Sequence, residues 1–493
     1  MDFLDPNKKR SNKIKLYIGY LLVAIAISLG ALVLLFANAG YRVDGSGNIT
    51  QNGLVFVNSH PGGANIYIEG LHNKYKTQGK TDTKFELREG SYKVTLQKEG
   101  YRSWQREINI EGGLVERLAY PFLFPEKLKD NDLKSYDNEP KIVSSSPDRN
   151  WIIAQQPDNF LQFDVFNANE PEKPSTIFKI PEGLLTPAQT AQSLKVLEWS
   201  ADNSNILMKH EFDSQAEFVI VNKDKTDTSI NINKLTGQQP FNVTLKDRKV
   251  GQLYLQMAAD GLLQTVDIKT KALTPLVNHV LSFKSHGDDM LVYVEPNAEK
   301  PDVVNVKIKT KDKDYMLREL PSKTTYVTNV AKFDSAWYVV VGAASDNKVY
   351  IYKNPLDSLA KDSQKPLFAR TLRINNPKKV SFSANARMMA AQSDQSFAVF
   401  DAETDRQYRY KINDKFDTNR PAEWMDGHRL ATSTDKSVLI FDFDGINAQK
   451  LMPINPNTDV LFDRDYENAY TLNPVNNDGK SKLVQTKLLV SNN

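Results

Sequence analysis

The sequence contains no cysteine among its 493 residues. This absence excludes disulfide bridges, zinc sites built on thiolates and cysteine nucleophiles. Histidine is also scarce, and none of the histidines stands in an HExxH motif or at the i, i+4 spacing of a helical zinc site. We therefore expect turn or surface positions, with no catalytic or metal-binding role, for the six histidines: His60, His72, His210, His279, His286 and His428.

Motifs for nucleophilic catalysis and for phosphate binding are missing as well. There is no GxSxG elbow, no GxGxxG and no Walker sequence, and the run Gly45–Asn48 is not followed by a helical pattern. The string Asp442–Gly445 resembles the start of a calcium loop. Position twelve of such a loop is a bidentate Glu, but here it is Pro453, so we expect a β-turn. The sequence gives no catalytic, cofactor or metal residue.

The chain also lacks a strong charge of either sign. Its 63 basic and 60 acidic residues give a formal net charge of +3. The first 15 residues hold five basic and two acidic groups, so they account for this excess and the remainder is close to neutral. A nucleic-acid-binding domain would be net basic, and we therefore expect no nucleic-acid partner.

One segment without any charge stands out. Leu16–Ala39 is 24 residues long and apolar, which is about 36 Å as a helix and enough to cross a bilayer. Five basic residues precede it, and tyrosines flank its ends. The positive-inside rule predicts a cytoplasmic tail at 1–15, a membrane helix at 16–39 and an extracytoplasmic remainder, with the lipid bilayer as a partner.

A cleaved signal peptide is the competing interpretation of this segment. Ala37-Asn38-Ala39 has the A-x-A form of a cleavage site. Signal peptides, however, carry an apolar core of about 7–15 residues, and this one is longer. Length therefore favours an uncleaved single-pass anchor, and the bulk of the chain is exported in either case.

Residues 40–53 are polar and glycine-rich, and they predict a tether. From Leu54 to Phe122 short runs alternate between apolar and polar residues, and Gly- or Pro-containing turns separate them. Alternation with period two is typical of half-buried strands. The pattern predicts a small antiparallel β-sandwich at 54–122.

This region also carries an ordered series of short motifs. They are Pro61–Ala64, Ile66–Gly70, Thr81, Glu89–Val94 and Glu99–Tyr101. The series resembles the PEGA domain, although Asp82 stands where that family usually has proline. The resemblance implies a small β-sandwich that acts as a surface or envelope module, with no catalytic residues attached to it.

A polar connector is expected at 123–138, and a longer β-region with an internal repeat follows at 139–491. Each unit has a strand ending in an aromatic or apolar residue, a Ser/Asp/Asn/Gly turn and further apolar strands. This layout resembles bacterial propellers related to the tryptophan–aspartate repeat. The aromatic or apolar residues that mark the first strand of each unit, here called anchors, lie 38 to 56 residues apart. This period matches a four-stranded blade and predicts seven or eight blades. The anchors are Val143, Trp199, Leu245, Phe283, Phe333, Phe382, Trp424 and Phe462.

The last unit lacks an outer strand, and we expect a strand from the 122–145 region to close the ring, because an open edge invites aggregation.

Two surface features each have two interpretations. Lys307–Asp314 could form a polyanion-binding face or a solvated edge strand. Tyr408 and Tyr410 could line a sugar-binding face or lie on an outer blade strand.

The fold class is therefore all-β, with an N-terminal transmembrane helix, a PEGA-like sandwich and a propeller. We expect a membrane-anchored, extracytoplasmic binding or scaffold protein whose propeller is an interaction platform for an envelope protein or a cell-wall polymer. We expect it not to be an enzyme. The alternatives are an envelope assembly factor or sensor subunit, and a propeller glycan hydrolase or lyase with a site built from distant loops.

Overall fold

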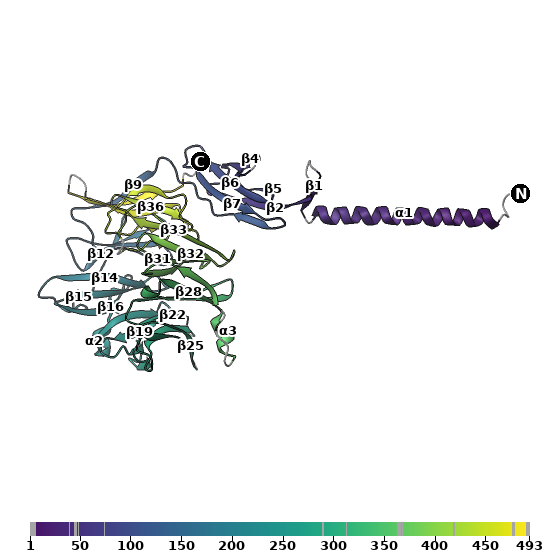
Figure 1. Ribbon diagram of the computed structural model, residues 1–493. Helices are drawn as coiled ribbons and strands as arrows, with labels where there is room; N and C mark the ends of the chain where they lie inside the picture. Colours follow the sequence, from purple (N-terminus) through teal and green to yellow (C-terminus); the bar gives the residue numbers. More distant parts are fainter. Residues whose placement is uncertain are drawn as a thin grey trace. The chain divides into compact units, whose positions relative to one another are not determined.

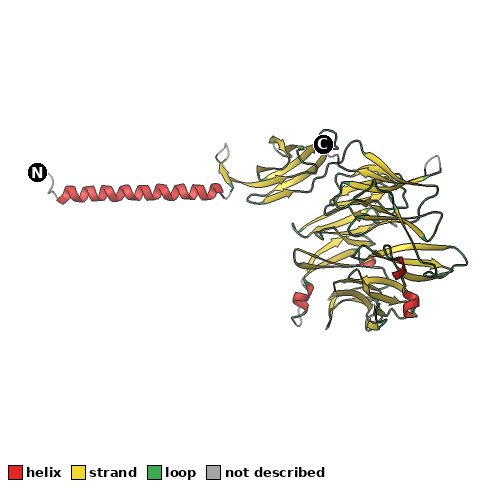
Figure 2. Ribbon diagram, turned by 180° about the vertical axis from the view of Figure 1, so that it is seen from behind, coloured by secondary structure: helices red, strands yellow, loops and turns green. Residues whose placement is uncertain are grey.

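The computed structural model describes residues 6–38, 40–43, 47, 49–72, 74–287, 290–311, 313–361, 366, 368–417, 420–475 and 479–489. Ala39 of the expected cleavage motif, and residues 44–46 and 48 of the expected tether, lie outside this part. The chain divides into two compact units, Met1–Lys127 and Leu128–Asn493. Strands dominate both, as Figure 2 shows. Each unit is described by itself.

The first unit begins with one long helix, α1 (Pro6–Asn38). Within its section Arg10–Asn38, an 18-residue stretch has a mean hydropathy of 2.6, and none of that stretch is buried in the protein. A helix satisfies its own backbone hydrogen bonds, so an apolar helix of this length can lie in lipid. The chain thus has one N-terminal apolar helix long enough to cross a membrane, at the place where the sequence predicts it (Figure 1).

Two four-stranded sheets form the rest of this unit. One sheet contains β1 (Tyr41–Val43), β2 (Ile49–Val57), β5 (Thr83–Arg88) and β8 (Val115–Leu118). The other has the order β4-β3-β6-β7, from β3 (Asn65–Gly70), β4 (Lys76–Lys80), β6 (Gly90–Gln97) and β7 (Trp104–Ile110). The predicted sandwich is present, but β2 and β8 pair in parallel, so it is not wholly antiparallel.

The core of the sandwich follows from the alternation in the sequence. Strand β7, for example, is buried at every second residue from Trp104 to Ile110. Side chains of successive strand residues point to opposite faces, so one face of each strand enters the core. The buried core includes Val55, Val57, Ile66, Ile68, Tyr92, Val94, Leu96, Trp104, Ile108 and Ile110.

The tether expected at 40–53 is wrong at both ends, because strands occupy 41–43 and 49–53. β2 begins at Ile49, and β1 pairs with Ile49–Gln51. Gly53 is buried, and a Cβ atom there would lie 2.5 Å from Ile110 Cγ2 and 2.6 Å from the Glu111 carbonyl oxygen. This glycine therefore permits close packing of two segments, which composition alone does not distinguish from linker flexibility.

The second unit contains eight four-stranded sheets in the part of the chain that the structure describes. Seven of them are built from consecutive strands. Their strands are β10 (Val143–Ser145), β11 (Trp151–Gln155), β12 (Gln162–Asn167), β13 (Thr176–Lys179); β14 (Gln192–Trp199), β15 (Asn205–Phe212), β16 (Gln215–Asn222), β17 (Ile230–Asn231); β18 (Pro240–Lys246), β19 (Lys249–Met257), β20 (Leu263–Asp267), β21 (Leu273–Val277); β22 (Ser282–His286), β23 (Met290–Pro296), β24 (Val303–Lys309), β25 (Asp314–Pro321); β26 (Tyr326–Phe333), β27 (Ala336–Ala343), β28 (Lys348–Lys353), β29 (Phe368–Arg373); β30 (Lys379–Phe382), β31 (Met388–Ser393), β32 (Ser396–Asp401), β33 (Arg406–Lys411); β34 (Glu423–Trp424), β35 (Arg429–Ser433), β36 (Ser437–Asp442), β37 (Gln449–Pro453).

The eighth sheet joins the two ends of the unit. It has the order β38-β39-β40-β9, with β38 (Leu461–Phe462), β39 (Asn468–Asn473), β40 (Ser481–Lys487) and β9 (Lys129–Tyr136). In Figure 1 the blue β9 lies among the yellow C-terminal strands. The predicted closing strand is therefore present, and the expected connector at 123–138 has to be corrected because half of it is this strand.

This arrangement is an eight-bladed β-propeller. All eight predicted anchors, from Val143 to Phe462, lie in the first strand of their sheets. Three blades share a Ser-x-Asp or Ser-x-Asn turn after that strand, in which the serine hydroxyl accepts the amide N–H five residues on, at 3.0 Å each time. These turns begin at Ser146, Ser200 and Ser383. The repeat inferred from the sequence is thus a repeat of hydrogen-bonded turns.

Helix is rare in the propeller. The N-cap of α2 (Ile232–Thr236) is Asn231, whose side chain accepts the Lys234 N–H, and its C-cap is Gly237 with φ 67°. α3 (Pro355–Leu359) lies between β28 and β29, and single turns of 3-10 helix occur at Thr226–Thr228 and Ala344–Asp346. A side-chain cap and a left-handed glycine are common helix ends.

Candidate functional site

The first strands of the blades surround a central channel. Residues from all eight sheets line it, either in the first strand or in the turns that flank that strand. The cavity has a volume of about 1910 Å³. Small-molecule pockets have volumes of roughly 300–1,000 Å³, so this space is large enough for a segment of a longer ligand. The channel is the candidate functional site.

The channel wall is net basic, although the propeller chain is not. Nine Lys or Arg and five Asp or Glu residues line the cavity, a formal excess of four positive charges. Some cations are neutralised locally, since Lys249 lies 2.8 Å from Asp247 and Arg420 lies 3.3 Å from Asp459. Among the residues that the structure describes, no ion pair is recorded for five of the lining cations: Lys141, Arg149, Arg248, Lys284 and Arg464.

One rim of the channel is formed by the turns after the first strands. The turns of neighbouring blades are hydrogen-bonded to one another. The Asp148 N–H donates to Asn203 Oδ1 at 3.1 Å, and the Ala201 N–H donates to the Arg248 carbonyl oxygen at 2.8 Å. Arg149 and Arg248 therefore lie on the same rim, on the first and third blades. Blade order also places Arg464 next to Arg149, across the closure of the ring.

A carboxylate lies below this rim. β14 has a bulge between Val196 and Glu198, which leaves Leu197 unpaired and 39% exposed in the channel wall. Glu198 Oε2 accepts the Leu245 N–H at 2.8 Å. Burial raises the pKa of Glu198, and that hydrogen bond and the charges of Lys284 and Arg248 partly offset the rise. The charge of Glu198 thus interacts with cations of the third and fourth blades.

Arg149 has an unusual environment on the rim. Its guanidinium lies 4.8 Å from the centre of the Tyr466 ring, which is a cation–π contact between the first and last blades. Its Nη1 is buried and has no hydrogen-bond partner within the described residues. A buried donor without a partner is costly, so an oxygen atom of a ligand would be stabilised there.

Five of the six histidines lie at turn or exposed positions, as the sequence predicts. His60, His72 and His279 are exposed, and His286 lines the channel with its ring 5.0 Å from that of Trp337. Burial lowers the pKa of His428 to about 4, so it is neutral at pH 7. In the described part of the chain no group of three or more His, Asp or Glu side chains has the arrangement of a metal site.

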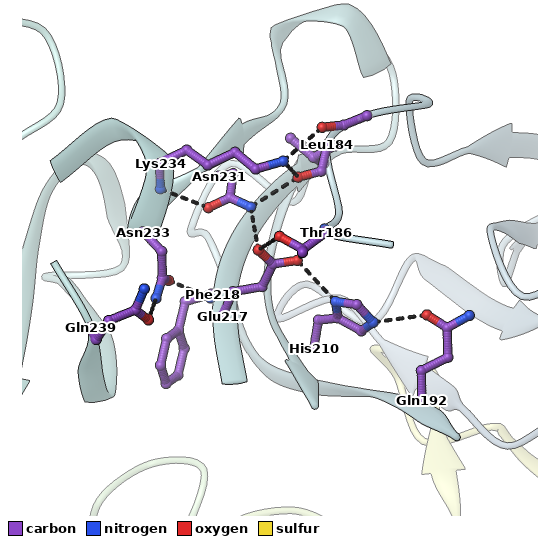
Figure 3. A network of polar contacts seen from close by, with 11 residues as sticks. Leu184, Thr186, Gln192, His210, Glu217, Phe218, Asn231, Asn233, Lys234 and Gln239 are labelled. Atoms are coloured by element: carbon purple, nitrogen blue, oxygen red, sulfur yellow. Dashed lines mark hydrogen bonds and ion pairs between the residues drawn. The ribbon is translucent and has the colours of Figure 1, made fainter. Parts of the chain in front are cut away.

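The exception is His210, which is fully buried in β15. Figure 3 shows its network. Its Nδ1 lies 2.9 Å from Glu217 Oε1, and its Nε2 lies 2.9 Å from Gln192 Oε1. Glu217 also accepts from the Thr186 N–H and hydroxyl and from Asn231 Nδ2, at 2.7 to 2.8 Å. Through Thr186 the network holds the loop before β14 against the blade, so its role is to stabilise the structure.

Two further sequence candidates belong to packing and turns. Asp442–Gly445 is a β-turn, in which the Gly445 N–H donates to the Asp442 carbonyl oxygen at 2.8 Å and Gly445 has φ 83°. Tyr410 stacks on Phe397 with ring centres 5.2 Å apart, and Tyr408 meets the edge of Phe443 at 5.0 Å. Both tyrosines belong to the outer strand β33, as the second of the two interpretations expects.

The lysine-rich string is likewise engaged in the fourth blade. Lys307 lies 2.5 Å from Glu295, and Lys309 lies 3.1 Å from Asp314. Asp312, in the same string, lies outside the described residues. The cations that converge in the channel were not identified from the sequence, because they lie in different blades and only the closed ring brings them together.

Comparison with known proteins identifies the first module. Residues 52–122 match the family described as PEGA domain. This stretch is a PEGA domain. The match covers the two-sheet sandwich from β2 to β8, and the Thr81 hydroxyl of the PEGA domain accepts the Ala64 N–H at 2.9 Å. Asp82, at the position that departs from the family pattern, has φ 72° and accepts from Asn58 Nδ2 at 2.9 Å.

No curated protein matches the sequence. Similar solved structures include the uncharacterized protein lmo1340 of Listeria monocytogenes EGD-e, with 12% identity, a TM-score of 0.41, and coverage of 66% of this chain and 93% of that one. Another is the β-propeller domain of Myceliophteria thermophila Cps50 (Swd1), with 9% identity, a TM-score of 0.39, and coverage of 73% and 100%. The assignment of the propeller rests on its sheets and their closure.

Proposed function

We propose that this chain is a membrane-anchored binding protein of the cell envelope. The apolar helix spans the membrane with its basic N-terminal end in the cytoplasm, and the PEGA domain and the propeller lie outside. The propeller is the interaction platform, and it binds a protein or a glycan of the envelope through the rim of its channel. In this proposal the protein is not an enzyme.

One observation carries the proposal. The propeller has a channel of about 1910 Å³ whose wall has an excess of four positive charges, while the chain after residue 15 is neutral as a whole. Charge concentrated inside a low-dielectric cleft attracts ligands of the opposite sign. A stiff closed ring can hold binding loops without paying for their ordering when a partner arrives.

The anchor and the topology are supported by composition. The helix section from Leu16 to Asn38 carries no charge, and the basic residues cluster N-terminal to it. An anchor keeps the binding module at the membrane surface, and a PEGA domain between the two serves as a spacer. A subunit of an envelope assembly or a sensor complex is the second candidate function, because the same platform would then bind a fixed protein partner.

Topology is tested by protease accessibility in intact cells that produce the full chain. We expect added protease to remove the PEGA domain and the propeller while an N-terminal epitope tag stays protected until the cells are lysed. A tag that is digested in intact cells, or a chain that is released from membranes by carbonate at high pH, would overturn the anchor.

Binding is tested by chemical cross-linking in intact cells followed by capture of the detergent-solubilised full chain. The matched control carries Lys269→Gln and Lys411→Gln, two exposed lysines on outer strands or turns of blades, and a second variant carries Arg149→Asn and Arg248→Asn. We expect the control to retain an envelope protein or polymer that the rim variant loses. Equal recovery by the two variants would contradict the platform.

A further inference from the structure

Two arginines of the channel rim occupy backbone positions that suit other residues. Arg149 has φ 61° and Arg248 has φ 54°, so both lie in the left-handed region. The corresponding turn of the second blade has Asn203 with φ 61°. Asn, Asp and Gly adopt this conformation most readily. The backbone conformation therefore does not favour arginine at either position, and the equivalent turn of the sixth blade has Ala386 with φ 59°.

Both side chains have hydrogen-bond donors to offer. Arg149 is held against Tyr466, and its Nη1 is buried with no partner in the described part of the protein. Arg248 is exposed on the channel wall, and its positive charge lowers the pKa of Glu198. A guanidinium presents its N–H groups in a planar fork that matches the two oxygens of a carboxylate or a phosphate.

Within the described residues, the cations without a recorded ion pair lie along half of the ring. Arg464, Arg149, Arg248 and Lys284 come from the eighth, first, third and fourth blades, and in a ring of eight the eighth and fourth blades lie opposite each other. The wall contributed by the fifth and sixth blades has one charged residue, Lys379, and this lysine is paired with Glu423. Because the cations are spread over several blades, one small anion cannot contact all of them.

From these contacts we propose that the channel rim binds the oxyanion groups of an acidic glycan, with Arg149 and Arg248 as its primary anchors. The inference rests on the proposed platform function and names its ligand class. A chain that carries a charge on successive units matches an arc of separated cations. The same wall also presents hydroxyl and amide side chains, among them Ser145, Ser285 and Asn329, which are groups that hydrogen-bond to sugar hydroxyls.

The oxyanions could be phosphates or carboxylates, and a titration of the full chain in detergent distinguishes them. The probes are tripolyphosphate, trigalacturonate, triglutamate and neutral maltotriose. The binding of each probe is measured by calorimetry at low and at physiological salt. We expect trigalacturonate, tripolyphosphate or both to bind with an affinity that falls as salt rises, and maltotriose to bind far more weakly. The acid that binds identifies the source of the oxyanions.

The decisive variant is Arg149→Asn with Arg248→Asn. Asparagine suits the left-handed backbone at both sites, so we expect the melting temperature to be unchanged or higher. Loss of charge-assisted hydrogen bonds should weaken binding by about tenfold or more. The Lys269→Gln, Lys411→Gln control has the same charge as this variant and should bind like the unaltered chain.

Three outcomes would overturn the inference. They are no binding of either acid, equal binding by the rim variant and the control, and binding of triglutamate as tight as that of trigalacturonate. If no acidic probe binds but cross-linking still captures a partner in a rim-dependent way, the glycan class is wrong and the platform stands. If the probes bind but no partner is captured, the platform function fails and the anion site remains.

Discussion

Trp424 Nε1 donates a hydrogen bond of 3.0 Å to Ser381 Oγ, across the interface between the sixth and seventh blades. The same bond, also 3.0 Å, joins Trp199 of the second blade to Ser144 of the first. In both pairs a tryptophan at the end of a first strand reaches a serine in the first strand of the preceding blade. The repeat is thus preserved in a contact between blades as well as inside each blade.

The hydrogen bond between Trp424 and Ser381 predicts losses of stability that differ with the atoms removed. Trp424 is 9% exposed, and its replacement by alanine should destabilise the propeller by about 3–5 kcal/mol, because it leaves a cavity and removes the hydrogen bond. Trp424→Phe should cost less, because it keeps most of the apolar contact. Ser381→Ala, which removes only the acceptor, should cost about 1 kcal/mol.

The measurement is urea unfolding of the three single variants and of the double variant Trp424→Phe, Ser381→Ala. The double variant should be more stable than the sum of the two single effects predicts, because both changes remove the same bond. Strict additivity would show that the indole N–H and the hydroxyl do not interact. A near-zero effect of Trp424→Ala would contradict the placement of this residue between blades.

The aromatic anchors were predictable from the sequence because each is a local feature. Trp199 and Trp424 are each followed by a short polar turn and an apolar strand, and a repeat of such units fixes the blade. The strand that closes the ring was predictable for a physical reason, since β40 would otherwise have an open edge. Its bounds were not predictable, because Lys129–Tyr136 is polar at most positions and its partner is about 350 residues away.

The buried histidine and the rim cations were not predictable. His210 pairs directly with Glu217 across the β15–β16 hairpin, and in the sequence both look like ordinary polar residues on exposed faces. Their burial depends on a loop that passes over them. Arg149 and Arg248 are separated by 99 positions, so their shared rim exists only after the ring closes. One local signal was available, namely arginine in a turn position where the second blade has Asn203.

The Glu217 network predicts a pH-dependent stability. Burial alone would raise the pKa of Glu217, but the hydrogen bonds from Thr186, His210 and Asn231 outweigh it and hold the pKa below its ordinary value of 4.5. A carboxyl with a lowered pKa binds fewer protons in the folded state, so its contribution is complete above about pH 4.5 and is lost as the pH falls through the folded pKa. Glu217→Gln should cost about 2–3 kcal/mol at pH 7.

The measurement is the free energy of unfolding of the unaltered chain and of the variant across the acid range. The difference between the two should be constant from pH 7 to about pH 5 and should shrink below about pH 4. Glu319→Gln is the matched control, since Glu319 is exposed and paired with Lys300 at 2.8 Å. A Glu217 difference that stays constant at low pH would mean that the pKa of Glu217 is the same in the folded and the unfolded protein.

Gly53 predicts a steric effect in the PEGA domain. A Cβ at this position would lie 2.6 Å from the Glu111 carbonyl oxygen, a backbone atom that cannot move easily. We expect Gly53→Ala to destabilise the PEGA domain by about 1–3 kcal/mol or more. In the propeller, Gly251 has no atom within 4 Å of the same Cβ, so Gly251→Ala is the matched control. Limited proteolysis at rising temperature, which reports on each unit separately, should detect early cleavage only in the Gly53 variant.

The position of strand β9 predicts how far the N-terminal part of the chain can be removed before the propeller loses stability. It pairs with β40 over Ser481–Lys487, and it brings Lys134 and Tyr136 to the buried Asp164, at 2.7 and 2.9 Å. A chain that begins at residue 128 should therefore form a monomeric propeller with one cooperative thermal transition. A chain that begins at residue 137 loses the outer strand of the last blade and leaves a buried carboxylate short of two partners.

For the shorter chain we expect a lower melting temperature and aggregation in light scattering, because the edge of β40 is then open to other molecules. A synthetic peptide of residues 128–137 should restore the monomer, since it supplies the missing strand and both partners of Asp164. Within the peptide, Tyr136→Phe should weaken the rescue by removing the bond to Asp164 Oδ2. If both truncated chains were equally stable and monomeric, β9 would be dispensable for ring closure, and the eighth blade would need only the strands that follow Leu461.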